Sequence, residues 1–155
     1  MSLKKKGKLH TKLLMLDIDR NFLQQQLNNI GNPGLIEDLE FCGYVPNQDL
    51  PAIYSQAEMF LYPSLRESFG IPILEAMACG VAVITSNTSS MPEIAEDSAE
   101  YCNPFDPESI AAAIEIFQQN KEYKNNIALK GIERANSFSW TNNAKQTLDI
   151  YNKLF

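Results

Sequence analysis

Short apolar runs alternate along this chain with longer segments in which apolar residues recur every three or four positions. The short runs predict buried strands, and the periodic segments predict helices with one apolar face. The predicted strands cover residues 12–18, 39–45, 58–64, 81–85 and 99–104. The predicted helices cover residues 20–30, 46–57, 69–80, 91–96, 106–120, 121–135 and 140–154.

Proline, glycine and aspartate mark the ends of two of these helices. Pro72 falls in the first turn of helix 69–80, where a missing N–H costs little, and Gly80 stands where glycine commonly ends a helix. Asp106 opens helix 106–120 as a cap, with a proline directly after it. Local signals and hydrophobic periodicity therefore predict the same helices.

The alternation of strands and helices predicts a parallel sheet with helices on both faces. Because crossovers between parallel strands are right-handed, we expect a Rossmann-like doubly wound α/β domain over residues 12–155. Residues 1–11 are interpreted as a basic stub or cloning remnant. Ligands of such sheets bind beyond the carboxyl ends of the strands. The loop 63–70 leaves one such end and enters a helix, so we expect a ligand there.

Two glutamates, Glu67 and Glu75, bracket an apolar turn in this region. The helix that begins near Gly70 has free N–H groups and partial positive charge at its start, which suits a phosphate. Ionised carboxylates accept hydrogen bonds, so each glutamate suits a hydroxyl-rich group. A nucleotide sugar, with ribose, diphosphate and hexose in a row, has this layout. Spacing alone leaves a second interpretation open, in which the glutamates only favour the helix dipole.

Composition excludes several classes of protein. The net charge is -6, which argues against a nucleic-acid binder. The three cysteines form no close pair, so neither a disulfide framework nor a zinc site is predicted. No apolar run reaches the roughly 18 residues that a membrane span needs. We therefore expect a cytoplasmic protein.

The segment from Phe41 to Glu96 carries several motifs in order, among them G-Y-V, a strand ending in P-S, E-S-F-G-I-P-I-L-E-A-M-A-C-G and V-A-V-I-T, and a late F-S-W follows. Over about residues 38–151 the chain resembles the glycosyl transferases group 1, retaining enzymes of the GT-B fold. The resemblance implies a transferase acting in glycan or glycolipid biosynthesis, and it places this chain in the C-terminal, donor-binding half. It also implies that the first strand and helix of that half and the N-terminal acceptor domain are missing, so the chain alone is expected to be inactive.

The resemblance assigns the transferred sugar and the diphosphate to the start of helix 69–80. Glu67 corresponds to the family's first glutamate, which contacts the sugar hydroxyls and takes the catalytic place. Phe69, Gly70 and Ile71 correspond to residues whose backbone N–H groups bind the sugar and the diphosphate.

The remaining donor contacts lie on both sides of that stretch. Glu75 corresponds to the glutamate that binds the ribose hydroxyls, with Leu74 beside it, and Val45 corresponds to a residue that lies against the base. Family members need no metal here, so we expect no metal and no cofactor, only the nucleotide-diphosphate sugar as substrate. Peripheral contact with the inner face of the membrane, frequent among full-length relatives, would belong to the missing half.

The sequence departs from the family pattern at Asp17 and Asp19, where glycines are usual. One interpretation is a phosphatase that uses these aspartates, but the expected threonine does not follow them. Another is the metal-binding aspartate pair of GT-A glycosyltransferases, which also needs further residues. The commoner interpretation makes Asp19 the cap of helix 20–30. A further alternative is a binding module that keeps the fold and the glutamates without catalysis.

Three other residues are expected to have no catalytic or binding role. Cys79 is expected in the core, and Trp140 is expected to anchor the last helix. His10 is the only histidine and is expected to be solvated, which argues against Ser-His and Cys-His nucleophiles. Lys4, Lys5, Lys6 and Lys8 are not assigned to a phosphate.

Overall fold

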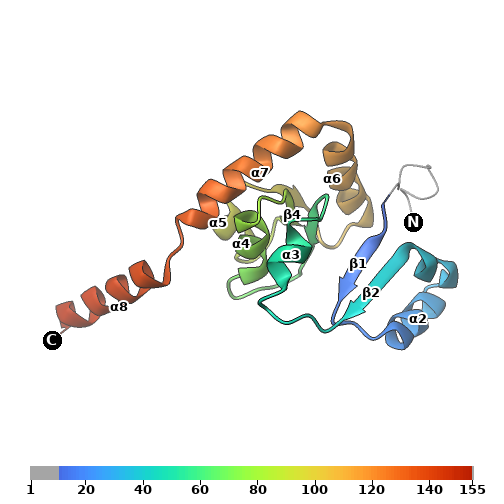
Figure 1. Cartoon of the computed structure of the whole chain (residues 1–155), viewed down its shortest axis with the longest axis horizontal. Coiled ribbons are helices and arrows are strands. Elements are labelled where there is room, and N and C mark those ends of the chain that lie inside the picture. The colour runs from blue at the N-terminus through green and yellow to red at the C-terminus, as the bar shows by residue number, and fades with distance from the viewer. Residues whose placement is uncertain (1–10, 155) are drawn as a thin grey trace. The chain divides into compact units, whose positions relative to one another are not determined.

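A computed structural model describes residues 11–154 of the chain. His10 and the four lysines before it lie outside the described residues. The chain divides into two compact units, one ending at Leu50 and the other beginning at Pro51 (Figure 1). Every strand pairing in both units is parallel, as the alternating pattern predicted.

The first unit is a two-stranded sheet with one α-helix and one short 3-10 helix. It contains β1 (Leu13–Leu16), α2 (Arg20–Asn29), η1 (Pro33–Asp38) and β2 (Leu39–Gly43). The side chain of Asp19 accepts a hydrogen bond from the N–H of Phe22 at 2.7 Å, so the prediction of a helix cap is confirmed. Asp17 has a positive φ of 51° and donates its N–H to the carbonyl of Gly43.

The prediction that strand 12–18 is buried was wrong. Leu13 and Leu14 are each 44% exposed. The reason is the small size of this unit, in which only Leu27 and Ile36 are buried among the described residues. Two strands and one helix do not offer enough apolar surface to cover both faces of a sheet.

The second unit carries a three-stranded sheet in the order β3-β4-β5. Its elements are α3 (Leu50–Tyr54), β3 (Phe60–Tyr62), α4 (Ile71–Ala78), β4 (Val83–Ser86), α5 (Met91–Ala95), β5 (Glu100–Cys102), α6 (Pro107–Gln119), α7 (Lys121–Asn136) and α8 (Trp140–Leu154). The central strand β4 is buried along its whole length. The sheet therefore forms the middle of this unit, with its strand ends leading into the loops that follow.

Helix α3 is shorter than the predicted helix 46–57. The N–H of Asp49 donates to the carbonyl of Pro46 at 2.9 Å, which makes residues 46–49 a turn. The helix begins only after this turn and covers Leu50–Tyr54. Helices α6 and α7 follow the prediction closely, and Asp106 caps α6 by accepting from the N–H of Glu108 at 3.0 Å.

The second unit has a core between its sheet and helices α6 and α7, and α4 packs beside it. Ile84 and Cys102 of the sheet pack with Phe117 of α6 and Ile127 of α7. Helix α4 buries Met77 completely and packs against α7. At the crossing point, a Cβ on Gly131 would lie 3.0 Å from the Cγ of Met77, so only glycine lets the two helices approach this closely.

Helix α4 ends as the sequence predicted. Gly80 has a φ of 73° and donates its N–H to the carbonyl of Met77 at 2.9 Å, and Val81 donates to Ala76 at 3.1 Å. This pair of bonds is a Schellman motif, which satisfies carbonyls at the helix end. Cys79, expected in the core, is only partly buried.

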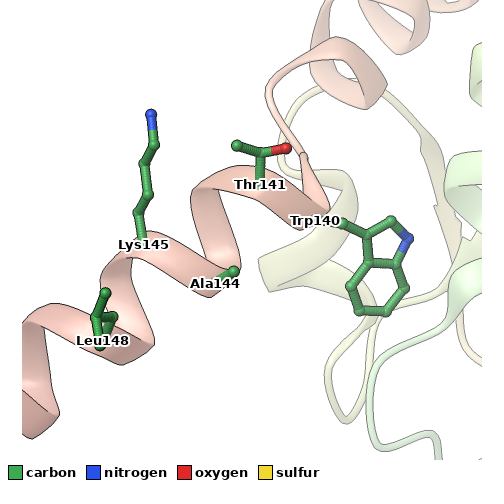
Figure 2. A pocket seen from close by; sticks show the side chains of 5 residues that line it. All are labelled: Trp140, Thr141, Ala144, Lys145 and Leu148. Atoms are coloured by element: carbon green, nitrogen blue, oxygen red, sulfur yellow. The ribbon is translucent and has the colours of Figure 1, made fainter.

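Helix α8 has no buried residue. Trp140, at its first position, is 83% exposed, so the prediction that this ring anchors the helix was wrong. Figure 2 shows the ring pointing away from the helix axis, and all five residues that line the pocket there belong to α8. Within residues 11–154, no helix combines the length and the apolar character that crossing a membrane requires.

Candidate functional site

The loop between β3 and α4 carries the first of the two glutamates, and α4 carries the second. Glu67 lies in the loop and Glu75 in α4, and both are partly buried. Gly70 precedes the helix with a φ of 99°, a conformation that side chains rarely adopt. A Cβ at this position would also lie 3.2 Å from the Cδ1 of Ile73. The chain thus needs glycine at the point where the loop becomes a helix.

The carboxylate of Glu67 is held by two hydroxyl groups. The phenol of Tyr62 donates to its Oε1 at 2.7 Å, and the hydroxyl of Ser64 donates to the same oxygen at 2.8 Å. Tyr62 is the last residue of β3, and Ser64 follows it in the loop. Both bonds fall on Oε1, so Oε2 keeps its capacity to accept a further hydrogen bond.

The carboxylate of Glu75 is held in the same way by a different tyrosine. The phenol of Tyr54, the last residue of α3, donates to its Oε2 at 3.2 Å. Burial, followed by the negative charge of Glu75, raises the pKa of Tyr54 well above its usual range. Burial and the hydrogen bond to Glu67 likewise raise the pKa of Tyr62 to about 12. Both phenols therefore keep their protons at neutral pH and remain donors.

One aromatic cluster carries both of these tyrosines. The rings of Tyr54 and Phe60 meet edge to face with centroids 5.3 Å apart, and Phe60 stacks with Tyr62 at 5.7 Å. Phe60 is the first residue of β3 and Tyr62 the last, so period-2 alternation places their rings on the same face of the strand. The two glutamates are thus held by hydroxyls from a single packed cluster.

Serines at the end of β4 and in the loop after it hold the backbone around Glu67. Ser86 donates to the carbonyl of Ser64 at 2.6 Å, and Ser90 donates to the carbonyl of Phe69 at 3.0 Å. Ser89, with a positive φ of 58°, donates to the carbonyl of Glu67 at 2.8 Å and accepts from its N–H at 3.2 Å. Sequence analysis missed this contact, although the run S-N-T-S-S after a strand was a visible signal of it.

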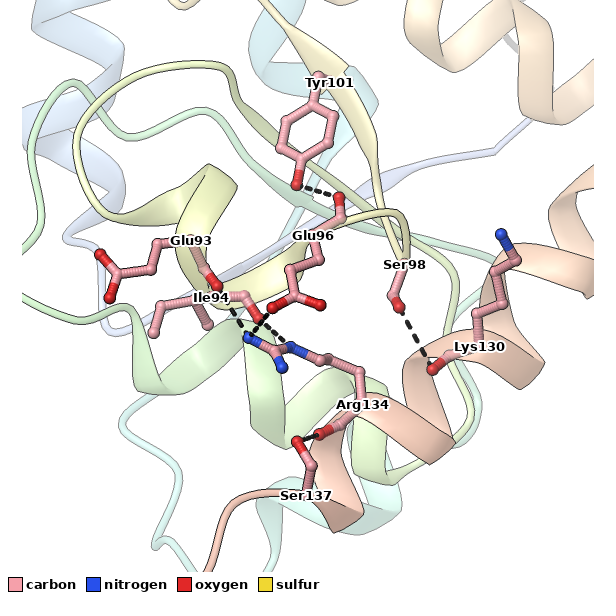
Figure 3. A network of polar contacts seen from close by, with 8 residues as sticks. All are labelled: Glu93, Ile94, Glu96, Ser98, Tyr101, Lys130, Arg134 and Ser137. Carbon is pink, nitrogen blue, oxygen red and sulfur yellow. Dashed lines mark hydrogen bonds and ion pairs between the residues drawn. The ribbon is translucent and has the colours of Figure 1, made fainter. Parts of the chain in front are cut away.

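The ring of Phe69 is supported from the C-terminal side of α7. It meets Phe138 edge to face at 5.8 Å, and the guanidinium of Arg134 lies over Phe138 at 4.7 Å. Figure 3 shows Arg134 reaching the end of α5, where it donates to the carbonyls of Glu93 and Ile94, each at 2.8 Å. The late F-S-W motif thus contributes its phenylalanine to the site loop.

The other predicted donor-binding residues fall into two groups. Ile71 is half exposed at the start of α4, and Leu74 is partly buried in the same helix. Val45 follows β2 in the first unit, so its place beside a nucleotide base stays a prediction. The described residues contain no group of three or more metal-ligating side chains close together.

Comparison with known proteins identifies the family. The model of the glycosyl transferases group 1 matches residues 2–134, so the chain belongs to this family. The O-antigen chain mannosyltransferase B of Escherichia coli is 41% identical over 116 residues, which are 75% of this chain and 30% of that protein.

Solved structures agree on the fold. The sucrose-phosphate synthase of Thermosynechococcus elongatus superposes with a TM-score of 0.80 at 26% identity, over 93% of this chain and 38% of that one. Anabaena HepE in complex with UDP superposes with a TM-score of 0.80 at 18% identity, over 92% and 41% of the two chains, and shows the fold alone. The predicted Rossmann-like α/β fold, the C-terminal half of the GT-B architecture, is confirmed. This chain spans well under half the length of these relatives.

Proposed function

We propose that this chain is the donor-binding part of a retaining, metal-independent glycosyltransferase that moves a sugar from a nucleotide-diphosphate sugar to an acceptor. The similarity to an O-antigen chain mannosyltransferase supports glycan biosynthesis as the setting. The acceptor would be bound by the N-terminal domain of such enzymes. Transfer therefore needs that domain, and this chain alone would bind the donor without turnover.

One observation carries the proposal. Glu67 and Glu75 stand on either side of Gly70, the residue that caps α4, and one oxygen of each carboxylate accepts a hydrogen bond from a tyrosine. Hydroxyl groups are the natural partners for such oxygens, because an ionised carboxylate only accepts hydrogen bonds. The N–H groups at the start of α4 suit the diphosphate that lies between the two sugars of the donor.

The roles follow from this arrangement. Glu67 orients the transferred sugar and, with its negative charge, stabilises the positive charge that develops on that sugar in the transition state. The backbone of Phe69, Gly70 and Ile71 binds the diphosphate, whose negative charge the helix dipole favours. Glu75 binds the ribose hydroxyls, with Leu74 packed beside it.

Calorimetric titration with UDP-, GDP- and ADP-sugars tests the proposal, and UDP is a reasonable first nucleotide because one structural neighbour holds it. We expect one nucleotide series to bind, and we expect Glu67→Gln and Glu75→Gln to weaken it at least about tenfold, since each loses a charged hydrogen bond. Glu133→Gln, at an exposed position of α7, is the matched control. Melting scans without ligand establish that each variant folds. Scans with ligand check the titration, because a ligand that binds only the folded state raises its stability.

Two results would count against the proposal. Absence of binding at millimolar donor concentrations would show that this chain has no donor site. Binding that both glutamine variants retain would move the site away from the glutamates. Transfer assays on the full-length protein then decide between an enzyme and a module that binds the donor without catalysis.

A further inference from the structure

Each of the two glutamates, Glu67 and Glu75, is contacted by one tyrosine. Tyr62 donates to Glu67 and Tyr54 donates to Glu75, and the two phenols come from different elements, β3 and α3. Each bond engages one oxygen of its carboxylate. The terminal torsion of a glutamate side chain has broad minima, so a carboxylate without such a bond would sample many orientations.

The tyrosines orient the carboxylates without neutralising them. Among the ion pairs of the described residues, none involves Glu67 or Glu75. A lysine or arginine in place of either phenol would hold the carboxylate too, but its charge would compete with the ligand for it. A phenol with a raised pKa stays neutral, so the full negative charge remains available to ligand hydroxyls.

Phe60 packs against both tyrosines and so links the Tyr54–Glu75 pair with the Tyr62–Glu67 pair. Its ring contacts both tyrosine rings, edge to face with Tyr54 and stacked with Tyr62. Aromatic contacts of this kind add to the stability gained from burial and restrict how each ring can move. The positions of both phenol oxygens are therefore set by packing before any ligand arrives.

We propose that Tyr54 and Tyr62 are positioning residues of the donor site, Tyr62 orienting Glu67 toward the transferred sugar and Tyr54 orienting Glu75 toward the nucleoside. This inference rests on the proposed function, because it assigns the two ends of the donor to the two glutamates. It predicts that the two tyrosines have different effects on binding, which a general loss of stability would not produce.

The chain offers a matched control. Tyr123 donates to Glu100 at 2.8 Å, and burial with this hydrogen bond also raises its pKa to about 12. Tyr123→Phe removes a hydrogen bond of the same kind from α7 and β5, away from the 63–70 loop. Any effect that this variant shares with Tyr54→Phe and Tyr62→Phe reports on stability alone.

The binding experiment uses the nucleotide sugar that the wild-type chain binds and the matching nucleoside diphosphate without sugar. We expect Tyr62→Phe to weaken the nucleotide sugar about tenfold and to leave the diphosphate within about twofold. Tyr54→Phe should weaken both ligands about tenfold, and Tyr123→Phe should change neither. Wild-type affinities in Tyr54→Phe and Tyr62→Phe would overturn the inference while the proposed function stands, and so would equal losses in all three variants.

A ligand-free measurement tests the pairs themselves. Incorporation of 3-fluorotyrosine makes each phenol more acidic, so that ¹⁹F NMR can follow its titration while the chain is folded. The six tyrosines give six signals, which single Tyr→Phe variants assign. We expect Glu67→Gln to move the titration of Tyr62 to lower pH, because a neighbouring negative charge is removed, and to leave Tyr123 unchanged.

The two measurements separate the possible failures. A Tyr62 titration that Glu67→Gln does not move would show that the pair is not formed in solution, and it would overturn the inference whatever the ligand does. A chain that shows the expected titrations but binds no nucleotide sugar would overturn the proposed function, and with it the assignment of the two tyrosines to a donor.

Discussion

Replacing Arg134 by methionine should destabilise the second unit although Arg134 lies in none of the predicted binding motifs. Its guanidinium donates to the carbonyls of Ile94 and Glu93 and pairs with Glu96 at 2.9 Å (Figure 3). It also lies over the ring of Phe138. Methionine keeps much of the apolar stem and loses all the polar contacts. The substitution therefore removes two hydrogen bonds, one ion pair and one cation–π contact at once.

The size of the effect follows from how exposed each partner is. Ile94 is buried, so its carbonyl loses a charged hydrogen bond that water does not easily replace, at a cost of about 2 kcal/mol. Glu93 is exposed, and water can take over its carbonyl. The stacking on Phe138 contributes about 0.5–1 kcal/mol, and the ion pair with Glu96, whose side chain is 58% exposed, contributes little. We expect a loss of about 2–3 kcal/mol in the free energy of unfolding.

Urea denaturation followed by circular dichroism measures this free energy, with the slope compared between variants. Lys130→Met is the control, because Lys130 forms an exposed ion pair with Asp97 whose removal should cost no more than about 1 kcal/mol. A loss below about 0.5 kcal/mol for Arg134→Met would show that water replaces the carbonyl bonds, and it would refute the reasoning from burial.

Further predictions concern packing, backbone conformation and pH. Gly131→Val should cost about 2–3 kcal/mol of unfolding free energy in urea denaturation, because its Cβ meets Met77 and the core has no room for the added methyl groups. Gly70→Ala should cost about 1–2 kcal/mol and weaken donor binding in calorimetry, because alanine is strained at a φ of 99°. The pKa values of Tyr62 and Tyr123 are raised from 10.0 to about 12 on folding. The stability they support is therefore present below about pH 10 and falls as the pH rises toward 12, and a double Tyr→Phe variant should lose less stability in urea melts over that range.

Local signals in the sequence predicted the regular elements well. Hydrophobic periodicity located the helices, and single residues such as Asp19, Gly80 and Asp106 marked their ends because caps act within one turn. Burial was less predictable. The apolar run of β1 has the composition of a buried strand, yet Leu13 and Leu14 are exposed because burial depends on what other elements cover.

The candidate site shows the same division between local and distant information. The motif around Glu67 and Glu75 could be found from the sequence because its residues are neighbours in the chain. The hydrogen-bond partner of Glu75 could not, since Tyr54 lies 21 residues before it and nothing local relates the two. Trp140 illustrates the opposite error, in which a large apolar residue was expected to be packed and lies exposed.

The hydrogen bonds that hold the 63–70 loop by its backbone affect which of its side chains can be substituted. The hydroxyls of Ser86, Ser89 and Ser90 donate hydrogen bonds to backbone carbonyls of the loop between β3 and α4. Every amino acid has such a carbonyl. The side chains of Leu65, Arg66 and Ser68 are exposed and take no part in these hydrogen bonds. Evolution or a mutant library can therefore exchange these three residues, and with them what the mouth of the site meets, while the loop keeps its course and Glu67 its place.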